Sequence, residues 1–247
     1  MARKSKTQEK STKQTQQLAS TQPSSSKGIS LDLPNISPKR HLECRVLLEN
    51  QILLIDNFLS AAECKAVAQF IDNLPLELTP PKRRGEAVRV NYRFSVTSPD
   101  FAQRLHELLV PHLPLFPPPA PDKRSGTALP AREPHSFNSN IRFYKYTPSQ
   151  HFGPHYDDSV RDAITGAKSE WTLLIYLSGI EDGVQGGETI FYKNEKCRPN
   201  ETAVAPLNRG TALLHRHGQD CLLHEGSEVV KGTKYVLRSD LMFKPQA

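Results

Sequence analysis

The second half of the chain is a series of short strand-like runs separated by turns, and this pattern constrains the fold more than any other feature. From Ile141 onward seven such runs follow one another: IRFYKY, the segment around HYD, WTLLIYLS, ETIFY, TALLHRH, CLLHE and KYVLRSDLMF. Short strands at regular spacing with turns between them are typical of antiparallel sandwiches and barrels. We therefore expect an antiparallel double sheet or jelly roll over residues 141–247.

Two helices are expected in the first half. Ser60 and Glu63 have the spacing of a capping box, and the residues that follow place apolar side chains on one helical face. Ser98-Pro99 combines an N-cap residue with Pro at the first helical position, and Pro111 ends this second helix. Residues 45–59 precede both helices and read as two short strands around Glu49-Asn50. The fold class that follows is α+β, mainly β, with the helices bracing the sheets.

Composition divides the chain into three regions. Residues 1–40 are expected to be a disordered basic tail and linker, because Lys, Gln, Ser and Thr dominate and no apolar periodicity is present. Residues 41–140 form the helical and strand support region, and residues 141–247 the core. Eight of the 24 residues in 111–134 are Pro, so this segment is expected to be a long loop, either a solvated spacer or a lid or partner-binding segment. The basic loop 80–84 (PPKRR) is a second segment that could border a substrate groove.

The basic character of the chain belongs to its N-terminal tail. Residues 1–30 contain six Lys and Arg residues against Glu9, whereas the whole chain carries only +6. The remaining body is thus nearly neutral, which argues against a nucleic-acid-binding surface. No run has the length of a membrane span and no secretory h-region is visible, so we expect a protein of the cytoplasm or nucleus with no membrane contact. The four cysteines lack CxxC spacing and are expected to be free thiols.

The sequence His155-Tyr156-Asp157 is the feature with the most chemical meaning. In an extended strand alternate side chains point the same way, so His155 and Asp157 can reach one metal ion from one face. A second imidazole from a distant strand would complete a ligand set of two histidines and one carboxylate. Such a set leaves coordination positions open, as in non-haem Fe(II) oxygenases. His224, His215 and His217 are the downstream histidines that could supply this third ligand, and the last two otherwise pack internally or lie at the surface.

In the order and spacing of its motifs, the region from Arg142 to Phe243 resembles the 2-oxoglutarate- and Fe(II)-dependent dioxygenases, specifically the prolyl 4-hydroxylase-like branch. The matching segments are Tyr144-Lys145-Tyr146, Gly153 to Asp157, Thr172 to Leu177, Gly186-Gly187-Glu188-Thr189, His224-Glu225-Gly226 and Lys234 to Asp240. The resemblance implies a double-stranded β-helix, the jelly-roll core of that family. It also implies that His155, Asp157 and His224 are the catalytic metal ligands.

The same resemblance assigns the cosubstrate site. A basic residue about ten positions after the distal histidine binds the far carboxylate of 2-oxoglutarate in the family, which corresponds to Lys234. Arg238 lies four residues later on the same strand and faces the same side, so it stays an alternative anchor. Tyr176 corresponds to a tyrosine that assists the anchor. Tyr146, and after it Tyr144, corresponds to a tyrosine that lines the pocket.

The resemblance implies an enzyme that uses Fe(II), 2-oxoglutarate and O2 to hydroxylate a C–H bond, with release of succinate and CO2. Ascorbate is the expected reductant that keeps the iron in the Fe(II) state. The favoured substrate is a prolyl residue in an intracellular protein or peptide. Two alternatives stay open: the same scaffold acting on a nucleic acid or small molecule, and a non-catalytic metal-binding interaction module.

Overall fold

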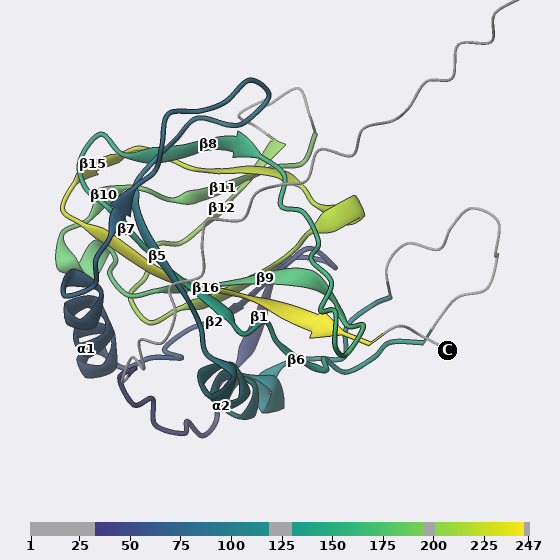
Figure 1. Cartoon of the computed structure of the whole chain (residues 1–247). Helices are drawn as coiled ribbons and strands as arrows, with labels where there is room; N and C mark the ends of the chain where they lie inside the picture. Colours follow the sequence, from purple (N-terminus) through teal and green to yellow (C-terminus); the bar gives the residue numbers. More distant parts are fainter. Residues whose placement is uncertain (1–32, 119–129, 195–200, 245–247) are drawn as a thin grey trace, which may run out of the picture.

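Two antiparallel sheets lie face to face, and two helices pack against the outer face of the larger one (Figure 1). The computed structural model describes residues 33–118, 130–194 and 201–244. The larger sheet contains β1 Cys44–Leu48, β2 Ile52–Ile55, β3 Glu77–Leu78, β5 Tyr92–Thr97, β6 Ser136–Phe137, β7 Asn140–Tyr146, β9 Lys168–Tyr176, β13 Ala212–Arg216 and β16 Lys234–Phe243. The smaller sheet contains β4 Arg89–Val90, β8 His151–His155, β11 Thr189–Tyr192, β12 Thr202–Ala205 and β14 Leu223–Gly226.

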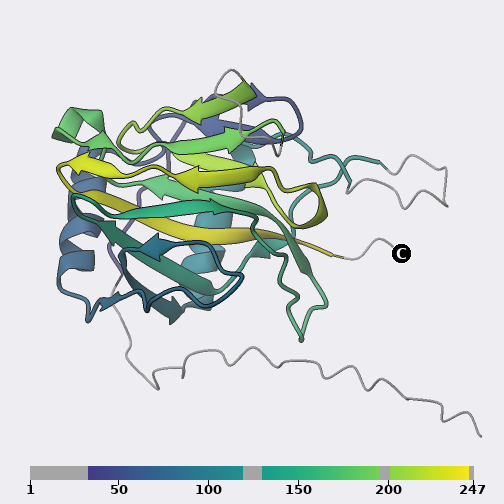
Figure 2. The same ribbon diagram turned by 90° about the horizontal axis from the view of Figure 1, so that it is seen from above.

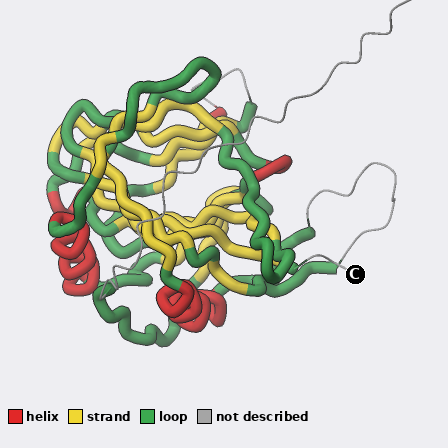
Figure 3. The backbone as a smooth tube through the Cα atoms, viewed as in Figure 1, coloured by secondary structure: helices red, strands yellow, loops and turns green. Residues whose placement is uncertain are grey.

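The remaining elements connect or cover these sheets. The helices are α1 Ala61–Asp72 and α2 Pro99–Leu109, followed by a short 3₁₀ turn, η1 Val110–His112. Further 3₁₀ turns are η2 Ile180–Asp182 and η4 Gly218–Asp220, and β10 Gln185–Gly186 pairs with β15 Val229–Lys231. Viewed with helices and strands in separate colours, the two strand layers and the helices on one side stand out (Figure 3).

The strand order explains how distant segments meet. It runs β1-β2-β13-β9-β16-β7-β5-β3 in the larger sheet and β12-β11-β14-β8-β4 in the smaller one. The long strand β16 lies between β9 and β7 and pairs antiparallel with both. In the smaller sheet β14 lies between β11 and β8. The view from above shows the strands of the layers running side by side (Figure 2).

Local sequence signals produce the elements as expected. The hairpin of β1 and β2 turns at Asn50, whose φ of 56° is a left-handed conformation that Asn tolerates. At α1 the backbone N–H of Ser60 donates to Glu63 Oε2 at 2.8 Å, while Ser60 Oγ accepts from the Glu63 N–H at 3.3 Å. At α2 the Ser98 hydroxyl accepts from the backbone of Phe101. The predicted hairpin and both predicted helices are confirmed.

The seven strand-like runs of the second half all contribute strands, which confirms the mainly β, jelly-roll fold class. One boundary differs from expectation. Strand β8 ends at His155, so Asp157 lies beyond it instead of continuing the extended alternation. There the Asp157 carbonyl accepts from the Gly218 N–H at 2.9 Å, and its own N–H donates to the Cys221 thiol at 3.3 Å. The chain leaves the sheet because the segment before β14 binds its backbone.

Alternating side chains on the larger sheet separate two apolar clusters. On the outer face, residues such as Leu173, Ile175 and Leu237 pack against α1 and α2 in what we call the helix-facing cluster. On the inner face, residues such as Tyr144, Tyr176 and Val236 pack between the sheets in what we call the inter-sheet cluster. The alternation is that expected of strands with both faces covered.

The segment expected to support the core contributes strands to the same sheet. β1 and β2 extend it beyond β13, and β5 pairs with β7 along six residue pairs from Tyr92–Lys145 to Thr97–Asn140. The two ends of the Pro-rich segment 111–134 are joined by reciprocal backbone hydrogen bonds of 2.9 Å between Phe116 and Arg132. Residues 119–129 of that segment and residues 1–32 of the expected tail lie outside the described residues.

Two further sequence expectations concern thiols and membranes. Cys44, Cys64 and Cys221 are free thiols, as predicted, whereas Cys197 lies outside the described residues. Among the residues that the structure describes, neither helix is long and apolar enough to span a membrane.

Candidate active site

The three residues expected to bind metal converge between the sheets. His155 ends β8 and is paired directly with His224 of β14, while Asp157 follows β8 by two residues. Their potential ligand atoms all lie within 4.8 Å of one another. The Asp157 carboxylate is 3.7 Å from His155 Nε2 through Oδ1 and 3.7 Å from His224 Nε2 through Oδ2. This donor set of two imidazoles and one carboxylate fits an Fe(II) ion with open positions.

Backbone carbonyls set the orientation of both imidazoles. His155 Nδ1 lies 2.9 Å from the Gly153 carbonyl, and His224 Nδ1 lies 2.9 Å from the Leu222 carbonyl. Since a carbonyl oxygen can only accept, each Nδ1 carries the proton and each Nε2 presents a lone pair. Such contacts fix the tautomer and ring angle of metal-binding histidines. Both Nε2 atoms are directed toward Asp157.

Protonation favours metal binding at this cluster. Burial lowers the pKa of His155 to about 3, with a further contribution from His224, so this imidazole is neutral at ordinary pH. Burial also lowers the pKa of His224. For Asp157 burial alone would raise the pKa, but the Arg238 guanidinium and the surrounding histidines hold it well below its usual value. Neutral imidazoles and an ionised carboxylate are the forms that bind metal.

Two side chains of the larger sheet hold the Asp157 carboxylate. Thr172 of β9 donates its hydroxyl to Oδ2 at 2.9 Å, and Arg238 of β16 lies 3.0 Å from the same oxygen through its NH2 group. Arg238 also lies 3.5 Å from Asp240 Oδ1. The guanidinium is therefore already paired with two carboxylates.

Lys234 is the buried cation of the pocket that has no carboxylate within salt-bridge distance in the described part of the chain. It is 5 % exposed, and its Nζ donates to the Gly187 carbonyl at 2.5 Å. The ammonium also lies 5.4 Å from the ring centre of Tyr146 and 5.5 Å from that of Tyr176. Burial lowers the pKa of Lys234 to about 8.

Gly187 is required at this point for two reasons. Its φ of +77° is a left-handed conformation, and a Cβ atom would lie 3.0 Å from Val229 and 3.2 Å from the Lys234 side chain. Its absent side chain therefore lets the carbonyl approach the lysine. Tyr176 also contacts Thr189: its hydroxyl is 2.7 Å from Oγ1 of Thr189, a residue that lines the cavity.

Tyr144 and Tyr146 both line the cavity, and the cation beside them was absent from the sequence expectations. Arg89 of β4 places its guanidinium carbon 4.5 Å from the ring centre of Tyr144 and 4.4 Å from that of Phe152. Burial would raise the pKa of Tyr144, but Arg89 and Arg238 outweigh it and lower the value to about 8. Arg89 lies in a two-residue strand within the alternating apolar and polar stretch 88–94, and this alternation does not reveal the contact of its side chain with two rings that line the cavity.

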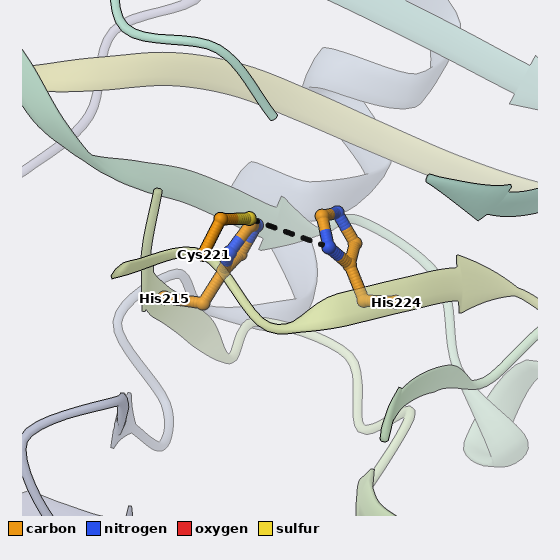
Figure 4. Close-up of side chains that lie close together, drawn as sticks. All are labelled: His215, Cys221 and His224. Carbon is orange, nitrogen blue, oxygen red and sulfur yellow. Dashed lines mark hydrogen bonds between the residues drawn. The ribbon is translucent and has the colours of Figure 1, made fainter. Parts of the chain in front are cut away.

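The two alternative histidines occupy different surroundings, and both are buried. His217 is hydrogen-bonded on both ring nitrogens, at 2.9 Å to Thr172 Oγ1 and 2.9 Å to Ser169 Oγ. His215 faces the metal-ligand candidates instead, with Nε2 3.6 Å from Asp157 Oδ2 and its ring centre 4.6 Å from that of His224. Together with Cys221 and His224 it forms a second group of potential ligand atoms within 4.8 Å (Figure 4).

These residues enclose a small cavity that adjoins an open groove. The cavity has a volume of about 50 Å³ and is lined by the metal-ligand candidates and by Lys234. Glu225 lines both this cavity and the groove, whose wall includes Lys82, Val88, His151 and Pro154. Lys82 belongs to the basic loop 80–84, which thus borders a groove, as the sequence suggested.

Comparisons with known proteins relate part of the chain to one enzyme family. Residues 141–239 match the family model described as the 2OG-Fe(II) oxygenase superfamily. A PKHD-type hydroxylase from Crocosphaera subtropica is 26% identical over 188 residues, which cover 75% of this chain and 76% of the relative.

A solved structure with a TM-score above 0.5 shares the fold at low sequence identity. A prolyl hydroxylase from Trichoplax adhaerens, in complex with a peptide fragment of the hypoxia inducible factor oxygen degradation domain, has a TM-score of 0.53. It is 16% identical and covers 78% of this chain and 84% of its own. The viral collagen prolyl hydroxylase of Paramecium Bursaria Chlorella virus-1 has a TM-score of 0.49 and 18% identity, over 78% of this chain and 96% of its own.

Proposed function

From the premise that residues 141–239 form a 2OG-Fe(II) oxygenase domain and that the chain is an oxidoreductase, we propose that it hydroxylates a prolyl residue of an intracellular protein. The observation that carries the proposal is the placement of His155, Asp157 and His224 around one cavity that Lys234 also lines. The first three residues suit Fe(II), and the fourth suits a dicarboxylate cosubstrate.

His155, Asp157 and His224 would hold the iron. Their three ligand atoms lie close enough together to share one ion, both Nε2 atoms are unprotonated, and Asp157 is ionised. Thr172 and Arg238 bind Asp157 Oδ2, so they restrict the rotation of the carboxylate and leave Oδ1 beside His155. These two residues are positioning residues that act through Asp157.

Lys234 would bind the distal carboxylate of 2-oxoglutarate. A dicarboxylate in a buried pocket needs a cation, because an unpaired charge there is costly. Lys234 offers an ammonium whose described contacts are the Gly187 carbonyl and the faces of Tyr146 and Tyr176. Arg238 is the weaker candidate because Asp157 and Asp240 already occupy its guanidinium. We therefore assign Lys234 to binding of the cosubstrate and Arg238 to holding the proposed metal ligand Asp157.

When bound, Fe(II) with 2-oxoglutarate and O2 supplies the oxidation of an unactivated C–H bond, with succinate and CO2 as co-products. Ascorbate would maintain the reduced iron. The residues of the chain bind and orient these partners, and the apolar walls of the inter-sheet cluster limit the access of water.

A peptide substrate would enter along the groove beside the cavity. That groove is open and includes the edge of the basic loop 80–84, and Glu225 connects it to the cavity wall. A relative is named as a PKHD-type hydroxylase, and a structure of the same fold holds a peptide fragment. We propose the cytoplasm or nucleus as the place of the reaction.

The proposal is tested by anaerobic reconstitution with Fe(II) and 2-oxoglutarate. We expect a visible metal-to-ligand charge-transfer band, followed by succinate release when oxygen is admitted. His155→Ala serves as the control that should show neither signal. Wild-type protein that gives no band and no succinate would refute the oxygenase function. Prolyl peptide arrays read by mass spectrometry then test the substrate class. Hydroxylation only of residues other than proline would support the oxygenase function but refute the prolyl substrate.

A further inference from the structure

A third imidazole lies beside the proposed metal ligands. His215 is the fourth residue of β13 and is paired with Thr172 of β9, so it shares the inner face of the sheet with the residues that hold Asp157. Its Nε2 is 3.6 Å from Asp157 Oδ2, almost the same as the 3.7 Å separations of the other two imidazoles from this carboxylate. Three imidazoles therefore surround one carboxylate.

The orientation of His215 repeats that of the two proposed ligands. Its Nδ1 lies 3.3 Å from the Arg216 carbonyl, which can only accept, so Nδ1 is the protonated nitrogen. The lone pair of Nε2 is then available on the atom that lies 3.6 Å from Asp157 Oδ2. His155 and His224 have the same arrangement of Nδ1 against a backbone carbonyl.

His215 Nε2 is also without a hydrogen bond among the described residues. The side chain is 2 % exposed, and this nitrogen is buried with no partner. At 3.6 Å the Asp157 carboxylate is too distant for a hydrogen bond. An unsatisfied buried polar atom is costly and therefore needs an explanation. A metal ion held by the neighbouring ligands would supply the missing partner.

We propose that His215 Nε2 is a fourth protein ligand to the metal in the protein without 2-oxoglutarate. The inference rests on the proposed function and adds to its three ligands. Four protein ligands leave one open position fewer than the set of two histidines and one carboxylate. Since 2-oxoglutarate and O2 would have to share the remaining positions, we expect His215 to leave the metal when the cosubstrate binds. The resting site is then less open to other ligands.

Cys221 lies next to the same imidazoles but is a poorer ligand (Figure 4). Its sulfur accepts from the Asp157 N–H at 3.3 Å and is 3.4 Å from the Leu222 carbonyl, to which the thiol donates. Its nearest nitrogen on His224 is Nδ1, at 3.9 Å, and that atom donates to the Leu222 carbonyl. The sulfur and this nitrogen are thus both engaged elsewhere, whereas His215 Nε2 is not.

The test uses the full chain loaded with Cu(II) alone, because pulsed electron paramagnetic resonance counts the imidazoles coordinated to this ion. We expect three imidazoles in the wild type and two in His215→Phe, with the dissociation constant for Cu(II) raised at least about tenfold. His217→Gln is the matched control: it removes a buried histidine from the same segment and should retain three. Saturation with 2-oxoglutarate should lower the wild-type count from three to two.

The outcomes separate this inference from the function on which it rests. Two imidazoles in the wild type would overturn the fourth ligand and leave the proposed site intact, whereas failure to bind Cu(II) would count against both. An intense thiolate-to-copper band would assign Cys221 as the ligand and also overturn the proposal. A count that stays at three with 2-oxoglutarate would overturn the displacement of His215. If circular dichroism shows that His215→Phe is unfolded, His215→Gln replaces it. The number of imidazoles in the wild-type protein is measured without any variant, so it tests the proposal in either case.

Discussion

The two faces of the larger sheet use the same strands for different purposes. On the outer face the helix-facing cluster consists of apolar side chains such as Leu173, Ile175 and Leu237, each fully buried. On the inner face the same strands carry Thr172, Tyr176 and Arg238 among apolar residues. Residues that are neighbours in the sequence therefore form the apolar core on one face of the sheet and the candidate active site on the other.

The contrast shows how a small domain tolerates buried charge. Asp157, Lys234 and Arg238 are all largely buried, and burial of charged groups is unfavourable unless they are paired. The helix-facing cluster removes large apolar surfaces from water, which is the main stabilising contribution in such folds. Because the two faces share a backbone, apolar packing on one side holds the polar groups of the other side in register.

The largest expected effect comes from removing the central carboxylate of the inner face. Asp157→Ala deletes a proposed metal ligand and leaves the buried Arg238 guanidinium without its nearest partner. We expect succinate production to fall below detection and metal affinity to fall by well over the ~10–100-fold typical of losing an outer hydrogen-bond partner. The neighbouring Asp158→Ala changes an exposed side chain and should retain both properties. Measurable turnover by Asp157→Ala would remove this residue from the site.

A substitution on the outer face of the larger sheet should lower the stability of the protein and leave the site unchanged. Leu173 is fully buried in the helix-facing cluster, so Leu173→Ala is expected to lower the free energy of unfolding by about 2–5 kcal/mol. Urea denaturation followed by circular dichroism measures this loss. At a temperature where the variant is folded, its affinities for metal and 2-oxoglutarate should equal those of the wild type. A large change in either affinity would mean that the two faces are not separable.

The buried ammonium of the inner face should give a pH dependence. Since burial lowers the pKa of Lys234 to about 8, the free enzyme carries the charge below that pH and loses it above. The KM for 2-oxoglutarate is therefore expected to rise above pH 8, approaching about tenfold per pH unit. Lys234→Arg should abolish this rise, because a guanidinium stays charged.

Substituting Lys234 and Arg238 separately by alanine tests which of the two side chains binds the distal carboxylate of 2-oxoglutarate. Lys234→Ala should weaken 2-oxoglutarate binding by on the order of 2–5 kcal/mol, because one partner of a buried charge pair is lost. Arg238→Ala should chiefly affect the metal site through Asp157. If Arg238→Ala raised the KM for 2-oxoglutarate and Lys234→Ala did not, the two roles would be reversed.

Among the substitutions at the site, the smallest expected effect comes from one hydroxyl on the inner face of β9. Thr172→Val keeps the shape of the side chain but removes the hydrogen bonds to Asp157 Oδ2 and His217 Nδ1. Metal affinity measured by anaerobic titration should fall about 10–100-fold, with the proposed ligands unchanged. Equal affinity in Thr172→Val and the wild type would show that Arg238 alone is enough to hold the carboxylate.

Sequence signals predicted local structure well because their causes are local. The capping box at Ser60, the Pro99 helix start and the alternating strands depend on neighbouring residues, and each formed as expected. The order of the strand runs also gave the fold class. The placement of His155 and His224 opposite each other followed from the family resemblance, because β8 and β14 are far apart in the sequence.

Contacts across distant strands could not be predicted in the same way. The run TALLHRH offers His215 and His217 on one side of a strand, but only the pairing of His215 with Thr172 decides which imidazole meets Asp157. Arg89 contacts the rings of Tyr144 and Phe152, which line the pocket, and the alternating residues around its short strand do not indicate these partners. The end of β8 at His155 likewise depends on Gly218 and Cys221, which bind the Asp157 backbone from a separate segment.

The position of the ligands between the sheets also has a consequence for folding. Asp157 follows β8 and His224 lies in β14, so their side chains meet only after segments distant in the sequence have paired. An unfolded chain would lack this site, and an ion that binds only the native state stabilises it in proportion to the logarithm of its concentration. The melting temperature should therefore rise with added metal, which makes thermal unfolding a measure of site assembly that is independent of any substrate.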